Sequence, residues 1–295
     1  FDPATTFLCG QCFRWRRRSP GAPLPAQPAI METGTQENGT DTRRVWIGMD
    51  GGHVLQLEQE PSALMLSNTT APIFRSHWLP YLDLETDYLP IQSALSDADP
   101  VMTEAIRFGK GLRLLRQDPW ETLVTFLLSQ NNGIPRIARI VDILCFHFGA
   151  GIPFEDGFLH RFPTPETLAA VSPEAFAVCR AGYRAEYVLR TARHLAEGRL
   201  DLAGLAALPY EEARARLLAL HGVGVKVADC VLLFSGLHRA AFPVDRWVFR
   251  VMDALYPGSG NTTEDLQAFA RARWGEHAGL AQEYLFHYAR RAGLD

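Results

Sequence analysis

The chain of 295 residues has very little lysine: only Lys110 and Lys226 among its 29 lysine and arginine residues. Arginine serves well on a surface or against phosphate, but its guanidinium does not give up a proton. A lysine amine can do so and then act as a nucleophile. A lysine in so arginine-rich a chain is therefore a candidate for amine chemistry. Lys110 stands in a turn between Gly109 and Gly111, where a solvated side chain is expected, but Lys226 has no such explanation.

Other shortages exclude whole classes of protein. Five cysteines are an odd set, so an even disulfide framework is excluded and a reduced compartment is expected. Cys9 and Cys12 form one CxxC pair, and a zinc or redox role for it lacks a second pair of ligands nearby. No apolar run reaches the roughly 18–20 residues of a membrane span, and the first residues carry no basic signal-peptide region. We therefore expect no membrane partner and an intracellular protein, cytoplasmic or nucleoid in a prokaryote, which is favoured, or nuclear in a eukaryote.

The chain divides into two regions of different patterning. Residues 12–16, 45–47 and 54–58 alternate as strands do, with a turn at Asp50-Gly51-Gly52. The stretch 19–41 is rich in Pro, Gly, Thr and Gln and predicts a disordered insertion. We expect an α+β, mainly α, fold: a β-rich domain over residues 1–90 with an antiparallel sheet, then an all-α domain over 91–295.

Helical patterning begins at about Asp83. Asp118 as N-cap and Pro119 in the first turn open one helix. About ten helices with short connections are expected, over 119–128, 134–148, 165–171, 173–179, 183–197, 209–220, 225–235, 244–255, 263–274 and 277–291.

The segment 218–230 holds the most informative local pattern. One helix ends just before Gly222 and Gly224, and the next begins at Val225. Glycine permits the positive φ of a tight reversal, and the start of a helix offers free N–H groups to a phosphate. Alone, such a turn is most often only a connection. Lys226, however, lies in the first turn of the new helix, where the field disfavours a charged amine and favours its nucleophilic form.

Asp245 follows an apolar loop and precedes another helix. A carboxylate in that place is often only an N-cap. With an activated lysine 19 positions earlier, it is also a candidate for stabilising positive charge on a sugar. The two roles are compatible, because both use the carboxylate oxygens.

Together these residues resemble a known family. The hairpin with Lys226, followed by Pro243-Val244-Asp245, resembles the helix–hairpin–helix and Gly/Pro…Asp motif of DNA glycosylases. Further stretches resemble its 8-oxoguanine DNA glycosylase branch: Gly-Gln-Cys-Phe-Arg-Trp at 10–15, Asn-Asn-Gly-Ile-Pro-Arg-Ile at 131–137, Gly-Tyr-Arg-Ala-Glu-Tyr at 182–187, and Ala281, Gln282 and Phe286. The resemblance covers nearly the whole chain outside the insertion.

The resemblance implies a bifunctional glycosylase and AP lyase acting on double-stranded DNA that contains oxidised guanine. Lys226 would attack C1′ of the sugar and form a Schiff base, and β-elimination would nick the strand. Asp245 would support the oxocarbenium-like transition state. The flipped base would lie in a pocket formed by Gly10, Cys230, Gln282 and Phe286.

Each pocket residue has an implied task. The Gly10 carbonyl would accept the N7–H that 8-oxoguanine has and guanine lacks. Gln282 would bind the Watson–Crick edge, while Phe286 and Cys230 would sandwich the ring. On periodicity alone, Phe286 and Cys230 would instead be assigned to the core.

The opposite strand has its own implied residues. Asn131, Arg136 and Arg184 would hold the cytosine left without a partner, and Tyr183 would wedge into the gap. Arginine and asparagine supply donors for the O2 and N3 acceptors of cytosine. On the residues alone, Asn131 serves equally well as a helix breaker.

Contacts with the DNA backbone complete the implied site. Phosphate contacts are expected at Gly222, Gly224, Val225 and Arg246. The hairpin carbonyls of Leu218, Leu220 and Val223 would hold a monovalent or calcium ion. No cofactor is expected to be required, no iron–sulfur cluster is expected because no cysteine follows Cys230, and we expect a monomer.

Two positions depart from the family's pattern. Trp247 stands where the family commonly has a histidine that helps to contact phosphate, and His221 replaces a common proline. Arg246 or Arg250 can supply the lost phosphate contact. Trp247 can equally reshape the pocket, shift substrate preference or slow the lyase step.

Three other functions remain open at this point. Glycosylases for alkylated bases generally keep the aspartate but lack the lysine, so Lys226 argues against them. An endonuclease III-like enzyme for oxidised pyrimidines would carry a C-terminal four-cysteine loop, which is missing after Cys230. A non-catalytic DNA-binding module would use only the hairpin, and Asp245 would then be a cap and nothing more.

Overall fold

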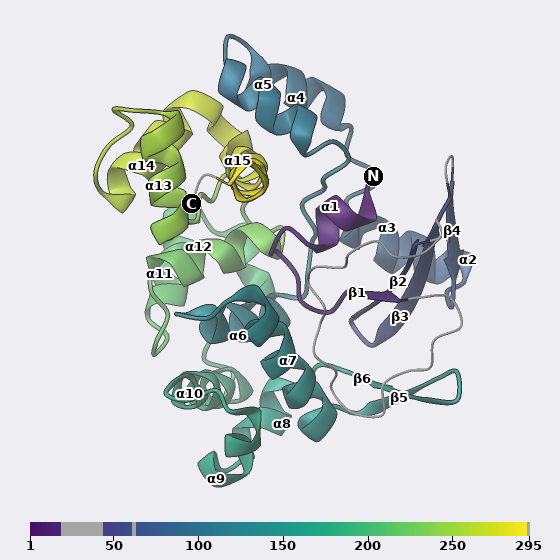
Figure 1. The fold of residues 1–295 in the computed structure, drawn as a ribbon. Helices are drawn as coiled ribbons and strands as arrows, with labels where there is room; N and C mark the ends of the chain where they lie inside the picture. Colours follow the sequence, from purple (N-terminus) through teal and green to yellow (C-terminus); the bar gives the residue numbers. More distant parts are fainter. Residues whose placement is uncertain (19–43, 61–62, 294–295) are drawn as a thin grey trace.

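A small sheet lies beside a larger set of helices (Figure 1) in the computed structural model, which describes residues 1–18, 44–60 and 63–293. The expected α+β, mainly α, fold is confirmed. The predicted insertion over 19–41 lies outside the described residues. None of the described helices combines the length and the apolar character that a bilayer crossing requires.

The sheet has four antiparallel strands in the order β1-β2-β3-β4. They are β1 (Arg16–Arg18), β2 (Arg44–Asp50), β3 (His53–Gln59) and β4 (Leu64–Ser67). The strands predicted at 45–47 and 54–58 are confirmed, and so is the turn between them, where Gly51 and Gly52 have φ of +54° and +83°. β4 was not predicted.

The strand predicted over 12–16 is wrong. Cys12 to Trp15 have no regular structure, and β1 begins only at Arg16. All four side chains over 12–15 are buried: Phe13 joins the helical core, while Trp15 joins the sheet core and stacks on Phe7. The alternation therefore reflects a segment buried on two sides, not one exposed face of a strand.

The ten predicted helices are present, with ends that differ by no more than three residues. In chain order the longer helical part contains α4 (Tyr88–Ser96), α5 (Pro100–Phe108), α6 (Pro119–Ser129), α7 (Ile134–Phe148), α8 (Pro165–Ala169), α9 (Pro173–Phe176), α10 (Arg184–Ala196), α11 (Tyr210–Leu218), α12 (Val225–Phe234), α13 (Arg246–Leu255), α14 (Thr263–Trp274) and α15 (Ala278–Ala292). The Asp118 carboxylate caps α6 as expected, accepting the Glu121 N–H at 2.7 Å.

Several short elements were missed. α1 (Pro3–Phe7), α2 (Ala71–Ile73) and α3 (Leu79–Tyr81) precede the helical part, and a π-helical turn over Phe74–Trp78 joins α2 to α3. Inside the helical part, β5 (Gly151–Phe154) pairs with β6 (Gly157–His160) as a separate hairpin. Elements of three to five residues are too short to show a reliable period.

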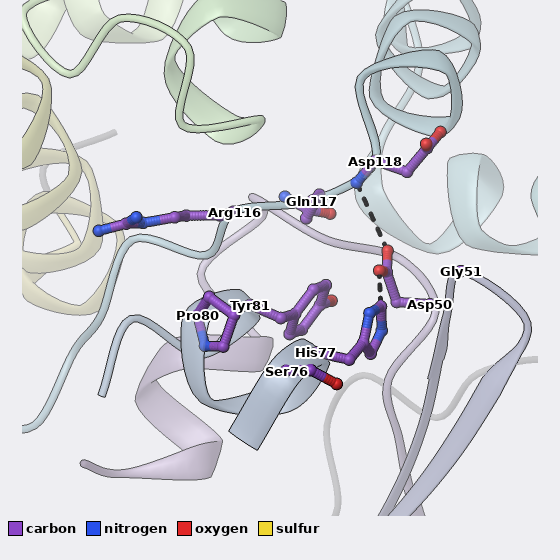
Figure 2. A pocket seen from close by; sticks show the side chains of 9 residues that line it. All are labelled: Asp50, Gly51, Ser76, His77, Pro80, Tyr81, Arg116, Gln117 and Asp118. Atoms are coloured by element: carbon purple, nitrogen blue, oxygen red, sulfur yellow. Dashed lines mark hydrogen bonds and ion pairs between the residues drawn. The ribbon is translucent and has the colours of Figure 1, made fainter. Parts of the chain in front are cut away.

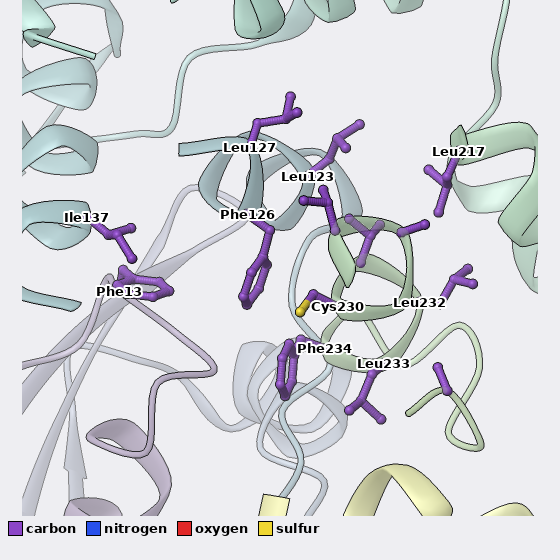
Figure 3. Close-up of a cluster of buried hydrophobic side chains, with 14 of the residues drawn as sticks. Phe13, Leu123, Phe126, Leu127, Ile137, Leu217, Cys230, Leu232, Leu233 and Phe234 are labelled. Atoms are coloured by element: carbon purple, nitrogen blue, oxygen red, sulfur yellow. The ribbon is translucent and has the colours of Figure 1, made fainter. Parts of the chain in front are cut away.

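The core consists mainly of a helical cluster and a sheet cluster. α6 and α12 pack together in the helical cluster, and Phe13 from the N-terminal segment enters it (Figure 3). Residues 9–15 therefore run between the two clusters, which places Gly10 at their junction. The domain division between residues 90 and 91 stays a prediction.

Candidate active site

The hairpin between α11 and α12 is shaped by its two glycines in different ways. Gly222 has a φ of +85°, and a Cβ there would lie 2.3 Å from the ring of Tyr187. Gly224 is extended (φ −97°, ψ 176°) and caps α12, so the expected positive φ holds only for Gly222. A Cβ on Gly224 would meet nothing within 4 Å among the described residues. The start of α12, where Val225 and Lys226 lie, is therefore open to a partner.

Lys226 makes contacts that leave its charge uncompensated. Its Nζ donates a hydrogen bond to Ser129 Oγ at 3.2 Å, at the end of α6, and lies 4.8 Å from the ring centroid of Phe126. Among the described residues, no carboxylate lies within ion-pair distance of it. A hydroxyl and an aromatic face therefore hold the amine in place. The half-buried amine is thus positioned to act as a nucleophile.

Cys230 lies one turn further along α12 and is only 2 % exposed. Burial raises the pKa of the Cys230 thiol to about 12; Lys226 opposes this shift and Asp245 adds to it. The thiol is therefore neutral and lies within electrostatic reach of both. Its side chain points toward Phe126 and Phe234 (Figure 3), whose rings stack with centroids 5.3 Å apart.

Asp245 is the N-cap of α13. Its Oδ1 accepts the backbone N–H groups of Trp247 at 2.9 Å and Val248 at 2.8 Å, which confirms the capping interpretation. Capping uses one oxygen of this half-buried carboxylate and leaves Oδ2 for another partner. Asp245 and Lys226 lie at two helix starts, 19 positions apart, and both are within electrostatic reach of the Cys230 thiol.

Gly10 and Phe286 lie against each other across the junction of the N-terminal segment with α15. Gly10 has a φ of +109°, and a Cβ there would come within 3.1 Å of Ile134 and 3.6 Å of Phe286. Phe286 also meets the ring of Trp247 edge-on, with centroids 4.7 Å apart. Trp247, which the family pattern did not explain, therefore forms part of the wall beside Phe286.

Gln282 lies one turn before Phe286 on α15 and is 5 % exposed. Its Oε1 has no hydrogen-bond partner in the described part of the chain. An unpaired buried amide oxygen costs about 1–3 kcal/mol, so this oxygen is suited to a ligand that supplies a donor.

Asn131, Tyr183 and Arg184 come together between α6 and α10. Asn131 has a φ of +51°, which asparagine tolerates better than most residues, and its Nδ2 donates to the Tyr183 hydroxyl at 3.3 Å. Arg184 is buried; it donates to the Gln130 carbonyl at 2.6 Å and lies 4.4 Å over the Tyr183 ring. Tyr183 is 51 % exposed and faces outward, as a wedge would.

Two arginines of the predicted site, Arg246 and Arg136, differ in their contacts. Arg246 Nη2 donates to Asn131 Oδ1 at 3.5 Å, so it lies with the group expected around the unpaired cytosine. Arg136 lies exposed at the start of α7, and its side chain makes no hydrogen bond or ion pair with the described residues.

A separate cavity of about 290 Å³ lies between the β2–β3 turn, α3 and the segment that enters α6 (Figure 2). His77 Nε2 lies 3.2 Å from Asp50 Oδ2 on its wall. None of the predicted site residues lines this cavity. In the described residues, no cluster of three or more His, Cys, Asp or Glu could hold a metal ion, and Cys9 and Cys12 are both free and buried.

Sequence reasoning missed three residues near the site. Ser129 directly precedes the Asn-rich stretch, so its position was a usable signal for a partner of Lys226. Glu283 and Arg290 gave no signal, because charged residues on an amphipathic helix normally face solvent. Glu283 is instead 2 % exposed, and Arg290 donates to the Cys9 carbonyl at 3.2 Å.

Comparisons with known proteins identify the family of the chain. The family model "8-oxoguanine DNA glycosylase, N-terminal domain" matches residues 1–123, and the model "HhH-GPD superfamily base excision DNA repair protein" matches residues 124–276. A probable N-glycosylase/DNA lyase of Methanothermobacter thermautotrophicus is 31 % identical, over 88 % of this chain and 93 % of that protein. The N-glycosylase/DNA lyase OGG1 of Arabidopsis thaliana is 34 % identical, over 95 % of this chain and 75 % of that protein.

Solved structures are similar over almost the full chain. The 8-oxoguanine glycosylase/lyase of Clostridium acetobutylicum, bound to double-stranded DNA with cytosine opposite 8-oxoguanine, is 34 % identical with a TM-score of 0.87 and covers 99 % of this chain and 93 % of that one. MBOgg1 in complex with a low-affinity DNA ligand is 37 % identical, with the same TM-score and coverage. The chain therefore belongs to the HhH-GPD superfamily of base excision DNA repair proteins and, within it, to the 8-oxoguanine DNA glycosylase family.

Proposed function

We propose that this protein is a bifunctional DNA glycosylase and AP lyase that excises 8-oxoguanine opposite cytosine and then nicks the strand. The observation that carries the proposal is the Lys226 amine, held at an open helix start by Ser129 and Phe126, without a carboxylate partner among the described residues. The Clostridium relative, solved with cytosine opposite 8-oxoguanine, supports the substrate.

Lys226 is the nucleophile of the proposed reaction, and Asp245 stabilises the charge that develops on the sugar. The neutral amine attacks C1′ of the damaged nucleotide, the C1′–N9 bond breaks, and the base leaves with the bonding electron pair and takes up a proton. The sugar ring then opens: the lysine nitrogen forms a double bond to C1′, the C1′–O4′ bond breaks, O4′ takes up the second proton of the amine, and the open sugar carries a Schiff base with Lys226. Proton loss from C2′ and β-elimination of the 3′ phosphate nick the strand, and water releases the lysine. Asp245 Oδ2, which the helix cap leaves free, stabilises positive charge on the sugar as the C1′–N9 bond breaks.

Recognition of the base rests on Gly10 and Gln282. The Gly10 carbonyl accepts the N7–H of 8-oxoguanine, and a guanine in its place would leave that carbonyl unpaired. The unpartnered Oε1 of Gln282 accepts a donor from the Watson–Crick edge of the base. Phe286 and Cys230 supply the flanking surfaces, and Trp247 supports Phe286 from the side.

Asn131, Arg184 and Arg136 hold the cytosine left behind when the lesion flips out, while Tyr183 fills the gap in the stack. Arg184 and Asn131 are already held around Tyr183 by direct contacts. Arg136 extends from an exposed position and can reach the cytosine when DNA binds.

The backbone of the hairpin contacts the DNA phosphates through Gly222, Gly224 and Val225, and one protein molecule acts on one duplex. The carbonyls of Leu218, Leu220 and Val223 are the proposed ligands for a monovalent or calcium ion. The Leu220 carbonyl already accepts the Val223 N–H at 3.2 Å, and a carbonyl oxygen has a second lone pair for an ion. Such an ion would add positive charge for the phosphate.

Borohydride trapping tests the proposal. The protein is mixed in turn with four duplexes, which hold 8-oxoguanine opposite adenine, cytosine, guanine or thymine. Sodium borohydride then reduces any Schiff base to a stable adduct. We expect an adduct that is strongest opposite cytosine and absent in Lys226→Gln. Lys110→Gln is the matched control, because it changes the other lysine and should trap normally. An adduct that persists in Lys226→Gln would remove Lys226 from the mechanism.

A further inference from the structure

Glu283 is a buried carboxylic acid directly beside the proposed base pocket. It follows Gln282 on α15 and is 2 % exposed, and its Oε1 has no hydrogen-bond partner among the described residues. Burial raises the pKa of Glu283 to about 7, while Cys9 and Arg290 act in the opposite direction. Burying a carboxylic acid costs free energy unless the acid has a polar partner, and an apolar residue at this position of the helix would avoid that cost. The presence of Glu283 therefore indicates a specific partner.

That partner is the thiol of Cys9, the residue immediately before Gly10. Cys9 is 1 % exposed; its thiol donates to the Thr6 carbonyl at 3.1 Å, accepts a hydrogen bond from Gln11 Nε2 at 3.3 Å and interacts with the Glu283 carboxyl. Arg290, two turns after Glu283 on α15, donates through Nη1 to the Cys9 carbonyl at 3.2 Å and lies 5.6 Å from the Phe286 ring centroid. Two side chains of α15 therefore hold both the side chain and the backbone of Cys9.

The residue after Gly10 is held equally firmly, from the other side. Gln11 Nε2 donates to the Arg113 carbonyl at 2.8 Å, and Gln11 Oε1 accepts the Leu115 N–H at 2.9 Å. The Gln11 carbonyl accepts a hydrogen bond from Gln117 Nε2 at 2.7 Å. Gly10 itself has no side chain and a φ of +109°, so the direction of its carbonyl is set by its two neighbours.

We propose that Glu283 is a positioning residue that acts through the Cys9 thiol to fix the Gly10 carbonyl, and so sets how strongly the enzyme prefers 8-oxoguanine to guanine. The inference rests on the proposed function and deepens it. A hydrogen bond weakens steeply once its angle is lost, so a Gly10 carbonyl that can rotate accepts the N7–H less well. Selectivity then falls even though no residue that touches the base has changed.

Conservative and non-conservative variants separate hydrogen bonding from packing. Glu283→Met keeps much of the side-chain volume but cannot bind the thiol, whereas Glu283→Gln keeps a hydrogen-bonding group. Likewise, Cys9→Ala loses the contact and Cys9→Ser retains it. Glu276→Gln, at an exposed position just before α15, is the control and should behave as the parent protein does.

The measurement is the affinity of each variant, in a Lys226→Gln background, for a duplex with 8-oxoguanine opposite cytosine and for the same duplex with guanine. We expect Glu283→Met and Cys9→Ala each to lower the ratio of the two affinities by about tenfold, the effect of about 1.4 kcal/mol, while Glu283→Gln and Cys9→Ser keep most of it. The double variant Glu283→Met with Cys9→Ala should lose no more than Cys9→Ala alone, because Cys9→Ala already removes the contact with Glu283.

Each result has one meaning. An unchanged ratio in Glu283→Met, or equal losses for both duplexes, would overturn the positioning role. Melting curves of every variant identify loss of fold, and Cys9→Ala gives a second, independent test if Glu283→Met is unstable. The proposed function itself would be overturned by two results together: the Lys226→Gln parent shows no preference for the 8-oxoguanine duplex, and the unmodified protein releases no 8-oxoguanine. If the parent prefers the 8-oxoguanine duplex and every variant keeps the same ratio of affinities, only this inference is overturned.

Discussion

The two halves of the site are built differently. Around the expected flipped base, Gly10, Cys230 and Gln282 come from parts of the chain far apart in sequence, and Cys230 and Gln282 are almost fully buried. Around the expected unpaired cytosine only Arg184 is buried: Asn131, Tyr183 and Arg136 are exposed, and the side-chain contacts that join Asn131 to its neighbours are 3.3 to 3.5 Å long.

This difference indicates how each half works. A buried wall cannot rearrange without opening cavities or leaving polar groups unpaired, so we expect the proposed base pocket to be formed before DNA arrives. Exposed side chains with few contacts adjust at little cost, so the other half takes its final shape on the DNA. We therefore expect changes in the buried half to alter which base is excised, and changes in the exposed half to alter only which base is tolerated opposite.

Asp245→Asn should have the largest effect, because Asp245 lies where the two halves meet. Asparagine is as good an N-cap as aspartate, so α13 and the melting temperature should be preserved. Loss of the charge that stabilises the sugar cation should slow base release by about 100-fold or more. Single-turnover release of 8-oxoguanine measures the rate.

Asp87→Asn is the matched control for that change, because Asp87 is an exposed N-cap, of α4, far from the expected chemistry in sequence. It should leave base release unaltered. Wild-type release by Asp245→Asn would reduce Asp245 to a helix cap and end its catalytic assignment.

Gln282→Leu should separate function from stability in the buried half. Leucine removes the unpaired Oε1, so the free energy of unfolding should stay level or rise, by up to about 1 kcal/mol. The same change removes a base contact and should slow release of 8-oxoguanine by about tenfold to 100-fold. Urea unfolding and single-turnover kinetics measure the two effects. A variant that is both less stable and fully active would show that Gln282 serves the core alone.

The sequence predicts those structural features whose cause lies in neighbouring residues, and it fails for features that depend on distant parts of the chain. The start of α6 follows from the Asp118 cap and Pro119, and the structure begins the helix where these signals put it. The segment 12–15 could not be predicted, because its side chains are buried by two clusters that only the tertiary fold brings together.

The candidate site shows the same limit. Lys226 stood out from composition and Asp245 from its position before a helix, so both could be proposed from local features. Glu283 and Arg290 could not, because their partners lie 274 and 281 positions away. The roles of Gly10 and Gln282 came from family resemblance, since nothing in a single glycine or glutamine predicts a base contact.

Arg246→Ala should sharpen the account of the exposed half with a moderate effect. If Arg246 orders Asn131 through the 3.5 Å contact, its loss should lower the preference for cytosine opposite the lesion several-fold, with no change in the salt dependence of binding. If Arg246 instead binds phosphate, affinity should fall equally for all four opposite bases, and the slope of log affinity against log salt should fall by about one. Binding to the four duplexes at several salt concentrations separates these results. Arg190→Ala, on the exposed face of α10, is the control.

The smallest expected effect concerns stability against pH, and it should arise in the buried half. Burial raises the pKa of Glu121 on α6 to about 8, with Arg14 opposing the shift. In the unfolded chain the same acid has a pKa of about 4.5. The contribution of its protonated form to the free energy of unfolding is therefore complete below that pH and is lost as the pH rises through about 8. Glu283, with a pKa of about 7, acts in the same direction.

The melting temperature should therefore fall by a few degrees between pH 5 and pH 8, and Glu121→Gln should flatten much of that fall because it cannot ionise. Glu186→Gln, exposed on α10 in the other half, should leave the slope as it is. Calorimetry or fluorescence melting over this pH range measures the difference. Equal slopes for Glu121→Gln and the parent would mean that Glu121 does not titrate in this pH range and would leave the fall to Glu283.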